Sequence, residues 1–125
     1  MKINKSRKLG FTLVEIMIVV AIIGLLAAIA IPNFVRARTT AQMNACINNL
    51  RQIDGAKQQW ALENHKLSTD VPTQANIDPY LGRSGSAATV VCPADGAVTF
   101  ATSYSILAVS TPPTCKIVPL THVLP

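Results

Sequence analysis

Charged side chains of either sign are absent from Ile16 to Val35, although the 125-residue chain carries 11 basic and 6 acidic residues in all. This gap excludes a water-exposed surface helix for the segment. Its length is close to the roughly 20 apolar residues that a helix needs to cross a bilayer. We therefore expect one membrane-spanning helix near the N-terminus.

Histidine is also scarce, and no catalytic set emerges. The two histidines, His65 and His122, have no Cys, Asp or Glu at metal-ligand spacing along the chain. We expect both to face solvent or to cap a helix, and His65 follows a predicted helix end where a cation is favoured. The sequence thus predicts no enzyme, no bound metal and no cofactor. Three serines of the C-terminal half alternate with apolar positions and are expected on the solvent face of a sheet: Ser103, Ser105 and Ser110.

Most of the positive charge lies at the extreme N-terminus. The net charge is +5, but the first ten residues hold four of the eleven basic side chains and no acid. The rest of the chain has seven basic against six acidic side chains, a balance of +1. Positive residues before an apolar span keep the N-terminus in the cytoplasm. A cationic groove for nucleic acid, which needs clustered basic residues, is not expected.

Between the basic tail and the apolar run lies Gly10–Glu15, with the sequence GFTLVE. A secretory signal is cut after its apolar stretch, whereas here the change from charged to apolar falls before it, at Gly10. Processing at this bond would leave the apolar helix on the mature chain. Glu15 stands just inside the membrane segment, where a carboxylate is costly and marks a functional site by default. The alternative is that Glu15 merely reaches the headgroups.

This arrangement resembles the prepilin signal of type IV pilins and type II secretion pseudopilins, over Lys8 to Arg38. The resemblance implies cleavage between Gly10 and Phe11 by a prepilin peptidase, and methylation of the new Phe11 amine. It also implies that Glu15 pairs with the Phe11 amine of a neighbouring subunit. Residues 45–53 and 60–64 are similar to one group of short bacterial pseudopilins.

Two residues inside the apolar run weaken the helix. Pro32 lacks an amide proton, so the helix should kink or loosen there, and Gly24 lowers helix propensity. Both residues are tolerated in membrane helices without any function. The resemblance implies instead that the helix stretches between Gly24 and Pro32 when it packs into a filament.

The predicted fold is α+β and pilin-like, with one long N-terminal helix half across the membrane and half on a small antiparallel β-sheet head. Residues 1–10 form the leader, 11–35 the transmembrane and assembly half, and 36–125 the extracytoplasmic head with the amphipathic half of the helix. The helix is expected from residue 11 to about 65, interrupted at Pro32. Its exported half places apolar residues at spacings of three or four: Met43, Ile47, Leu50, Ile53, Ala56 and Trp60. The opposite, polar face carries Asn44, Asn48, Arg51, Gln58 and Gln59.

Beyond the helix the pattern is of turns and short strands. Residues 66–78 are turn-rich, 78–81 form one helical turn, 82–85 form a loop, and Asp95-Gly96 is a turn. Strands are predicted from β-branched and aromatic content at residues 89–91, 98–100, 104–109 and 116–118.

Cysteine is also scarce, and the chain has three: Cys46, Cys92 and Cys115. An odd count permits one bridge and one thiol, and spacing does not fix the pairing. Cys46 belongs to the apolar stripe and is expected as a buried thiol. We expect Cys92 and Cys115 to be joined in an oxidising compartment. Some major pseudopilins hold calcium in an acidic C-terminal loop, and this sequence lacks those ligands. Trp60 is expected as a core anchor.

Three functions are compatible with this sequence. The favoured one is a pseudopilin that self-associates into a filament serving type II secretion, with other pseudopilins and an inner-membrane assembly platform. The alternatives are a type IV pilus subunit for adhesion or motility, and a membrane-held protein that captures DNA or another ligand. The small head favours the first, and the near-neutral mature chain argues against the third. The expected location is the bacterial inner membrane, single-pass, with a cytoplasmic N-terminus and a periplasmic head, or extracellular in a pilus.

Overall fold

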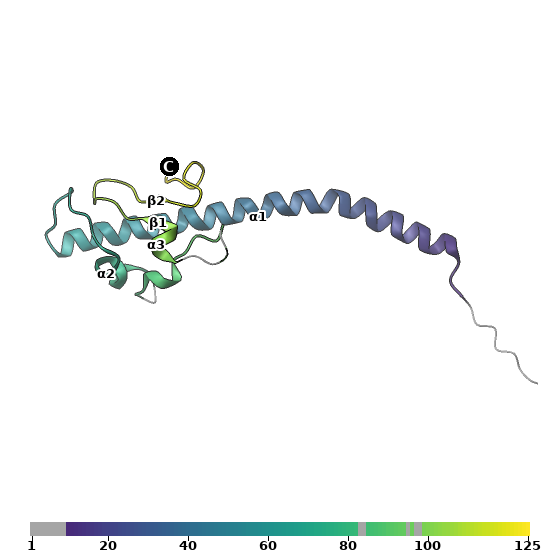
Figure 1. The fold of residues 1–125 in the computed structure, drawn as a ribbon, viewed down its shortest axis with the longest axis horizontal. Coiled ribbons are helices and arrows are strands. Elements are labelled where there is room, and N and C mark those ends of the chain that lie inside the picture. Colours follow the sequence, from purple (N-terminus) through teal and green to yellow (C-terminus); the bar gives the residue numbers. More distant parts are fainter. Residues whose placement is uncertain (1–9, 83–84, 95, 97–98) are drawn as a thin grey trace, which may run out of the picture. The chain divides into compact units, whose positions relative to one another are not determined.

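The computed structural model describes residues 10–82, 85–94, 96 and 99–125. Two compact units are formed, Met1–Ala37 and Arg38–Pro125. The long helix α1 (Leu13–Glu63) contributes to both, and the remaining elements belong to the second unit (Figure 1). These are α2 (Gln74–Ile77), η1 (Asp78–Tyr80), η2 (Ala87–Thr89), α3 (Phe100–Ser103), β1 (Tyr104–Ser105) and β2 (Thr114–Cys115). The predicted α+β class, with one long N-terminal helix and a small antiparallel sheet, is confirmed.

Helix α1 runs without interruption through Gly24 and Pro32. The predicted break at Pro32 is therefore wrong for the single chain. Proline removes one hydrogen bond, to the carbonyl of Ala28, and the turns on either side keep theirs. Among the described residues, α1 is the one helix long and apolar enough to cross a membrane, and its most apolar window has no buried residue.

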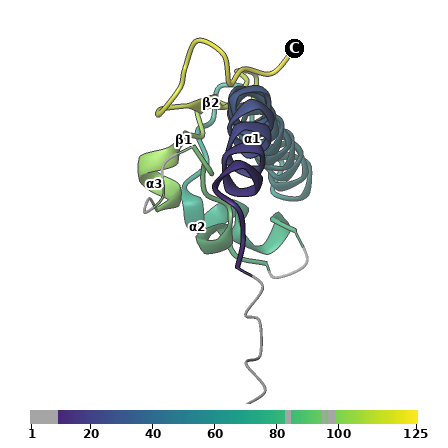
Figure 2. The same cartoon turned by 90° about the vertical axis from the view of Figure 1, so that its right-hand side faces the viewer.

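One face of the second half of α1 packs against the rest of the head. Leu50, Ile53, Ala56 and Trp60 are buried, as predicted. Met43 and Ile47 are only half-buried, and Cys46 and Lys57 complete the stripe instead. The predicted polar face is exposed at all five of its positions. Figures 1 and 2 both show α2, α3 and the strands close to this half of α1.

The sheet is smaller than the sequence predicts. β1 and β2 pair antiparallel with Tyr104 opposite Cys115 and Ser105 opposite Thr114. Among the described residues of the four predicted strands, only 104–109 contains strand structure, at its first two residues. Residues 116–118 form bends immediately after β2.

Local side-chain hydrogen bonds explain two of the missing strands. The Thr99 amide donates to Thr102 Oγ1 (3.0 Å), which begins α3 where a strand over 98–100 was predicted. The Ala88 amide donates to Ser86 Oγ (3.2 Å) and begins η2 over part of 89–91. Short hydroxyl side chains compete with strand pairing in this way. Val98 and Asp95 of the predicted strand and turn lie outside the described residues.

The core of the head lies between α1 and the segments that return to it. One buried cluster gathers residues from α1, η2, α3 and both strands, and a smaller one consists of Trp60, Ala61 and Val109. Tyr80 packs against both clusters, and its hydroxyl donates to Glu63 Oε2 (2.6 Å). The prediction of Trp60 as a core anchor is confirmed. The predicted helical turn at 78–81 is confirmed as η1, whereas α2 before it was not foreseen.

Candidate functional site

Glu15 is held by its own chain at the start of α1. Its Oε2 accepts hydrogen bonds from the amide and the hydroxyl of Thr12, both at 2.9 Å, and its own amide donates to Thr12 Oγ1 at 3.3 Å. This reciprocal pattern is a capping box, which satisfies amides that the first helical turn leaves free. The carboxylate also lies at the positive end of the helix dipole. The sequence shows this capping box as the pattern T-x-x-E, formed by Thr12 and Glu15.

The Gly10–Phe11 bond precedes α1 in exposed chain without regular secondary structure, and Phe11 is 87% exposed. The predicted cleavage site is thus not protected by helical hydrogen bonds. The rest of the leader lies outside the described residues, and processing stays a prediction.

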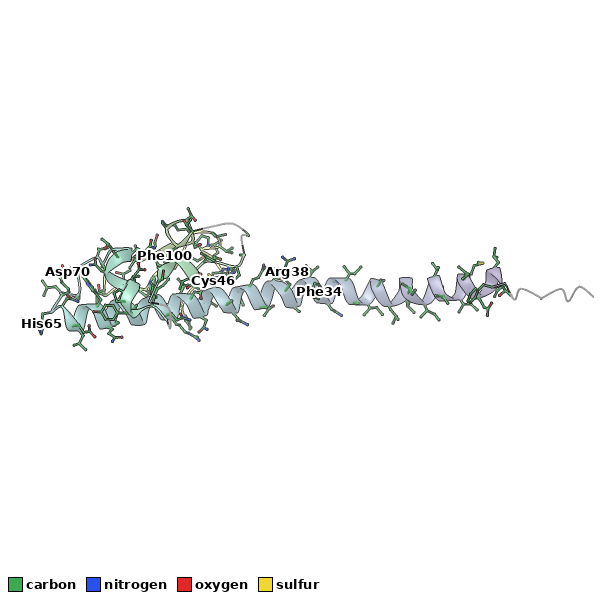
Figure 3. The ribbon with its side chains drawn as sticks, turned by 90° about the horizontal axis from the view of Figure 1, so that it is seen from below. Phe34, Arg38, Cys46, His65, Asp70 and Phe100 are labelled. Carbon is green, nitrogen blue, oxygen red and sulfur yellow. The ribbon has the colours of Figure 1, made fainter. Side chains whose placement is uncertain are left out.

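The large apolar side chains in the first half of α1 are exposed on every face of the helix (Figure 3). Leu13, Ile23 and Phe34 are 76, 60 and 70% exposed. A Cβ built on Gly24 meets no atom within 4 Å. No atom of the described residues therefore requires glycine at this position.

A buried lysine fastens a loop of the head to α1. Lys57 is fully buried, and its Nζ donates to the carbonyls of Ile106 (3.0 Å), Ala108 (3.0 Å) and Thr111 (2.5 Å). Asp54 Oδ1 lies 3.7 Å from the same nitrogen. Burial lowers the pKa of Lys57 below its ordinary value, and the Asp54 carboxylate opposes this shift. The burial of Lys57 could not be predicted from the sequence, because a lysine on an amphipathic helix usually faces water.

Four buried side chains with metal-ligand atoms meet in the head. Cys46, Cys92, Cys115 and His122 come from α1, the loop before α3, β2 and the C-terminal turn, and their ligand atoms all lie within 4.8 Å of one another. The sulfurs of Cys92 and Cys115 are 3.8 Å apart and not bonded, and all three cysteines are free thiols here. Burial raises the pKa of Cys46 and Cys92 above that of an ordinary thiol.

The sequence predicts a separate environment for each of these four residues. The burial of Cys46 is confirmed, and the pairing of Cys92 with Cys115 stays a prediction. The solvent-facing role expected for His122 is wrong, because its side chain is 5% exposed. His65 is exposed, as expected. Ser103, expected on a solvent face, is buried and donates to the Thr99 carbonyl (2.8 Å).

Comparison with known proteins adds to this geometry. The family described as the prokaryotic N-terminal methylation motif matches residues 5–31. The type IV major pilin protein PilA of Myxococcus xanthus is 41% identical over 76 residues, 61% of this chain and 34% of that protein. Type II secretion system core protein G of Aeromonas hydrophila is 27% identical over 84 residues, 67% of this chain and 57% of that protein. The type IV major fimbrial protein FimA of Dichelobacter nodosus is 40% identical over 84 residues, 66% of this chain and 51% of that protein. No solved structure matches the chain significantly.

The matched motif spans Glu15 and most of the apolar part of α1, the helix that is long and apolar enough to cross a membrane. The chain carries this motif and is similar both to type IV pilins and to a type II secretion core protein. It spans between 34 and 57% of the length of the three relatives named above.

Proposed function

We propose that this protein is a structural filament subunit that polymerises through the first half of α1. The observation that carries the proposal is the exposure of every large apolar side chain from Phe11 to Val35. Lipid covers such a surface while the subunit waits in the membrane. In a filament, the same surfaces of neighbouring subunits cover one another.

Glu15 supplies the polar contact of this assembly. Cleavage after Gly10 by a prepilin peptidase creates a cation at Phe11, and a carboxylate inside an apolar bundle needs such a partner. The amine of one subunit and the Glu15 of the next then fix the axial position of each addition. Methylation of a primary amine leaves it able to carry its charge.

Gly24 and Pro32 permit the helix to loosen as it packs. Glycine lowers helix propensity by about 1 kcal/mol, and proline has already removed one backbone hydrogen bond. The open space around Gly24 in the single chain is consistent with a role that arises only on assembly.

Of the two filament systems, we propose the type II secretion pseudopilus, with other pseudopilins and an inner-membrane platform as partners. The similarity extends over 57% of core protein G, compared with 34 and 51% of the two pilins. The alternative, a subunit of a surface type IV pilus, is favoured by the higher identity to the pilins, 41 and 40%. The proposed location is the inner membrane, with a cytoplasmic N-terminus and a periplasmic head.

Deleting the gene separates these two systems. Loss of secreted proteins from the culture medium, with surface pili still visible by electron microscopy, is the result expected for a pseudopilin. Loss of pili with unchanged secretion would assign the chain to a pilus. If both stayed unchanged, the filament proposal itself would be wrong.

Processing is the first prediction of this proposal. The chain purified from membranes should lack residues 1–10 and carry one methyl group on Phe11, because the bond after Gly10 is where charge gives way to apolar sequence. Intact-mass analysis measures both changes. Substitution of Gly10 by a bulky residue is the control and should leave the leader attached. A mature chain that begins after Ala30, or one that retains Met1, would contradict the prediction.

A further inference from the structure

The four ligand atoms in the head have the spacing of a metal centre. Cys92 Sγ and Cys115 Sγ are 3.8 Å apart, and His122 Nδ1 lies 3.8 Å from the first and 3.9 Å from the second. Cys46 Sγ stands within 4.8 Å of each. A tetrahedral ion with bonds of about 2.3 Å to sulfur holds its ligand atoms about 3.8 Å apart. A disulfide would instead require about 2.05 Å between two sulfurs.

We propose that Cys46, Cys92, Cys115 and His122 form a structural zinc site of the Cys₃His type. Three thiolates and one imidazole are a ligand set of closed, tetrahedral zinc sites. Soft sulfur ligands with no carboxylate among the four disfavour calcium and magnesium. On binding, the three thiols release their protons to solvent, and the neutral imidazole coordinates through Nδ1.

The surroundings of the cluster suit thiolate ligands. The backbone amide of Ala94 and the hydroxyl of Tyr104 favour the thiolate forms of Cys92 and Cys46, respectively, and so oppose the rise in pKa that burial causes. Asn49 Nδ2 donates to Tyr104 Oη and to the Val91 carbonyl, both at 3.0 Å. Such outer contacts orient metal ligands and stabilise their charge.

A surface cavity of about 340 Å³ lies beside His122, lined by Met43, Ala94, Val118 and Thr121 among others. The four ligands themselves are buried, so the site is closed once it is filled. That arrangement is typical of a structural centre and not of a catalytic one.

The structural benefit would be large for a head of this kind. The ligands come from four separate segments, and the only sheet among the described residues has two strands of two residues each. Domains with a small core commonly depend on a metal or on disulfides for stability. One ion at this position ties the loop before α3, β2 and the C-terminal turn to α1.

Metal content of the full chain tests the proposal. The protein is extracted from membranes in detergent without chelator or reductant, and zinc is measured by elemental mass spectrometry. We expect one zinc per chain, and replacement by Co²⁺ should give the visible bands of tetrahedral cobalt–thiolate coordination. The cobalt spectrum requires no substitution and so does not depend on a variant that folds.

Matched variants locate the ion. His122→Ala and Cys46→Ser should each lose the zinc, whereas His65→Ala, which removes the exposed histidine, should keep one zinc per chain. His122→Cys supplies a fourth thiolate and should restore metal binding with a stronger sulfur-to-cobalt charge-transfer band.

Three results would overturn the proposal. One is metal-free protein with a Cys92–Cys115 disulfide and an alkylatable Cys46 after unfolding. Another is three free thiols that fail to bind added Zn²⁺ or Co²⁺. The third is zinc retained in full by His122→Ala and Cys46→Ser, since the metal would then be bound elsewhere. None of these readouts depends on filament assembly.

Discussion

Glu15→Leu is expected to abolish filament assembly while the protein is still inserted, cleaved and methylated. In the proposed filament, leucine leaves the Phe11 amine of the adjacent subunit buried without a counter-charge. Removing one partner of a buried ion pair costs about 3–5 kcal/mol. Since about 1.4 kcal/mol is a factor of ten in an equilibrium constant, the loss at every subunit stops polymerisation. Electron microscopy of filaments and mass analysis of the membrane-bound subunit measure the two outcomes.

Thr12→Ala is the matched control, because it disrupts the capping box and keeps the carboxylate. Losing a cap of this type costs about 1 kcal/mol of helix stability, so filaments should still form. Equal failure of both variants would mean that Glu15 acts by starting α1 and not by contacting a neighbour. Normal filaments from Glu15→Leu, with unchanged yield and helical rise, would refute the paired-charge argument.

Lys57→Met should lower the free energy of unfolding of the head by about 2–4 kcal/mol. Methionine fills a similar volume but leaves the carbonyls of Ile106, Ala108 and Thr111 without their donor. Each buried polar group that loses its partner costs about 1–3 kcal/mol. Chemical denaturation of the full chain in detergent, followed by Trp60 fluorescence, measures the change.

The control for this variant is Lys66→Met. Lys66 is exposed, and its ammonium group lies 5.8 Å from the centre of the Trp60 ring, a contact worth little at such a site. Its replacement should change stability by less than about 0.5 kcal/mol, the usual range for surface positions. If the two variants were equally stable, the three hydrogen bonds of Lys57 would contribute nothing measurable.

The long helix could be predicted from the sequence because its signals are local. Apolar residues without charge from Ile16 to Val35, followed by a stripe at helical spacing through Trp60, specify one helix and the face that it buries. Two residues depart from these rules. Pro32 stays helical because only one hydrogen bond is lost, and Lys57 is buried because a distant loop offers it three acceptors.

The head could be predicted less well, since its order depends on contacts between distant residues. Residues 89–91 and 98–100 have strand-forming composition, but Ser86 and Thr102 start helical turns there. His122 was assigned to solvent from its neighbours in the chain, whereas it meets two cysteines 7 and 30 residues earlier. A contact between residues so far apart leaves no periodic pattern in the sequence, and only the three-dimensional structure shows it.

The capping box at Thr12 and Glu15 affects how subunits would join and leave the proposed filament. In the single chain the Glu15 carboxylate is already hydrogen-bonded by Thr12. Joining the proposed filament then exchanges one set of polar contacts for another and does not first expose a bare charge to lipid. A subunit that leaves the proposed filament can form the hydrogen bonds between Glu15 and Thr12 again. Subunits from a disassembled filament would thus return to the membrane. There they could be assembled again without new protein synthesis.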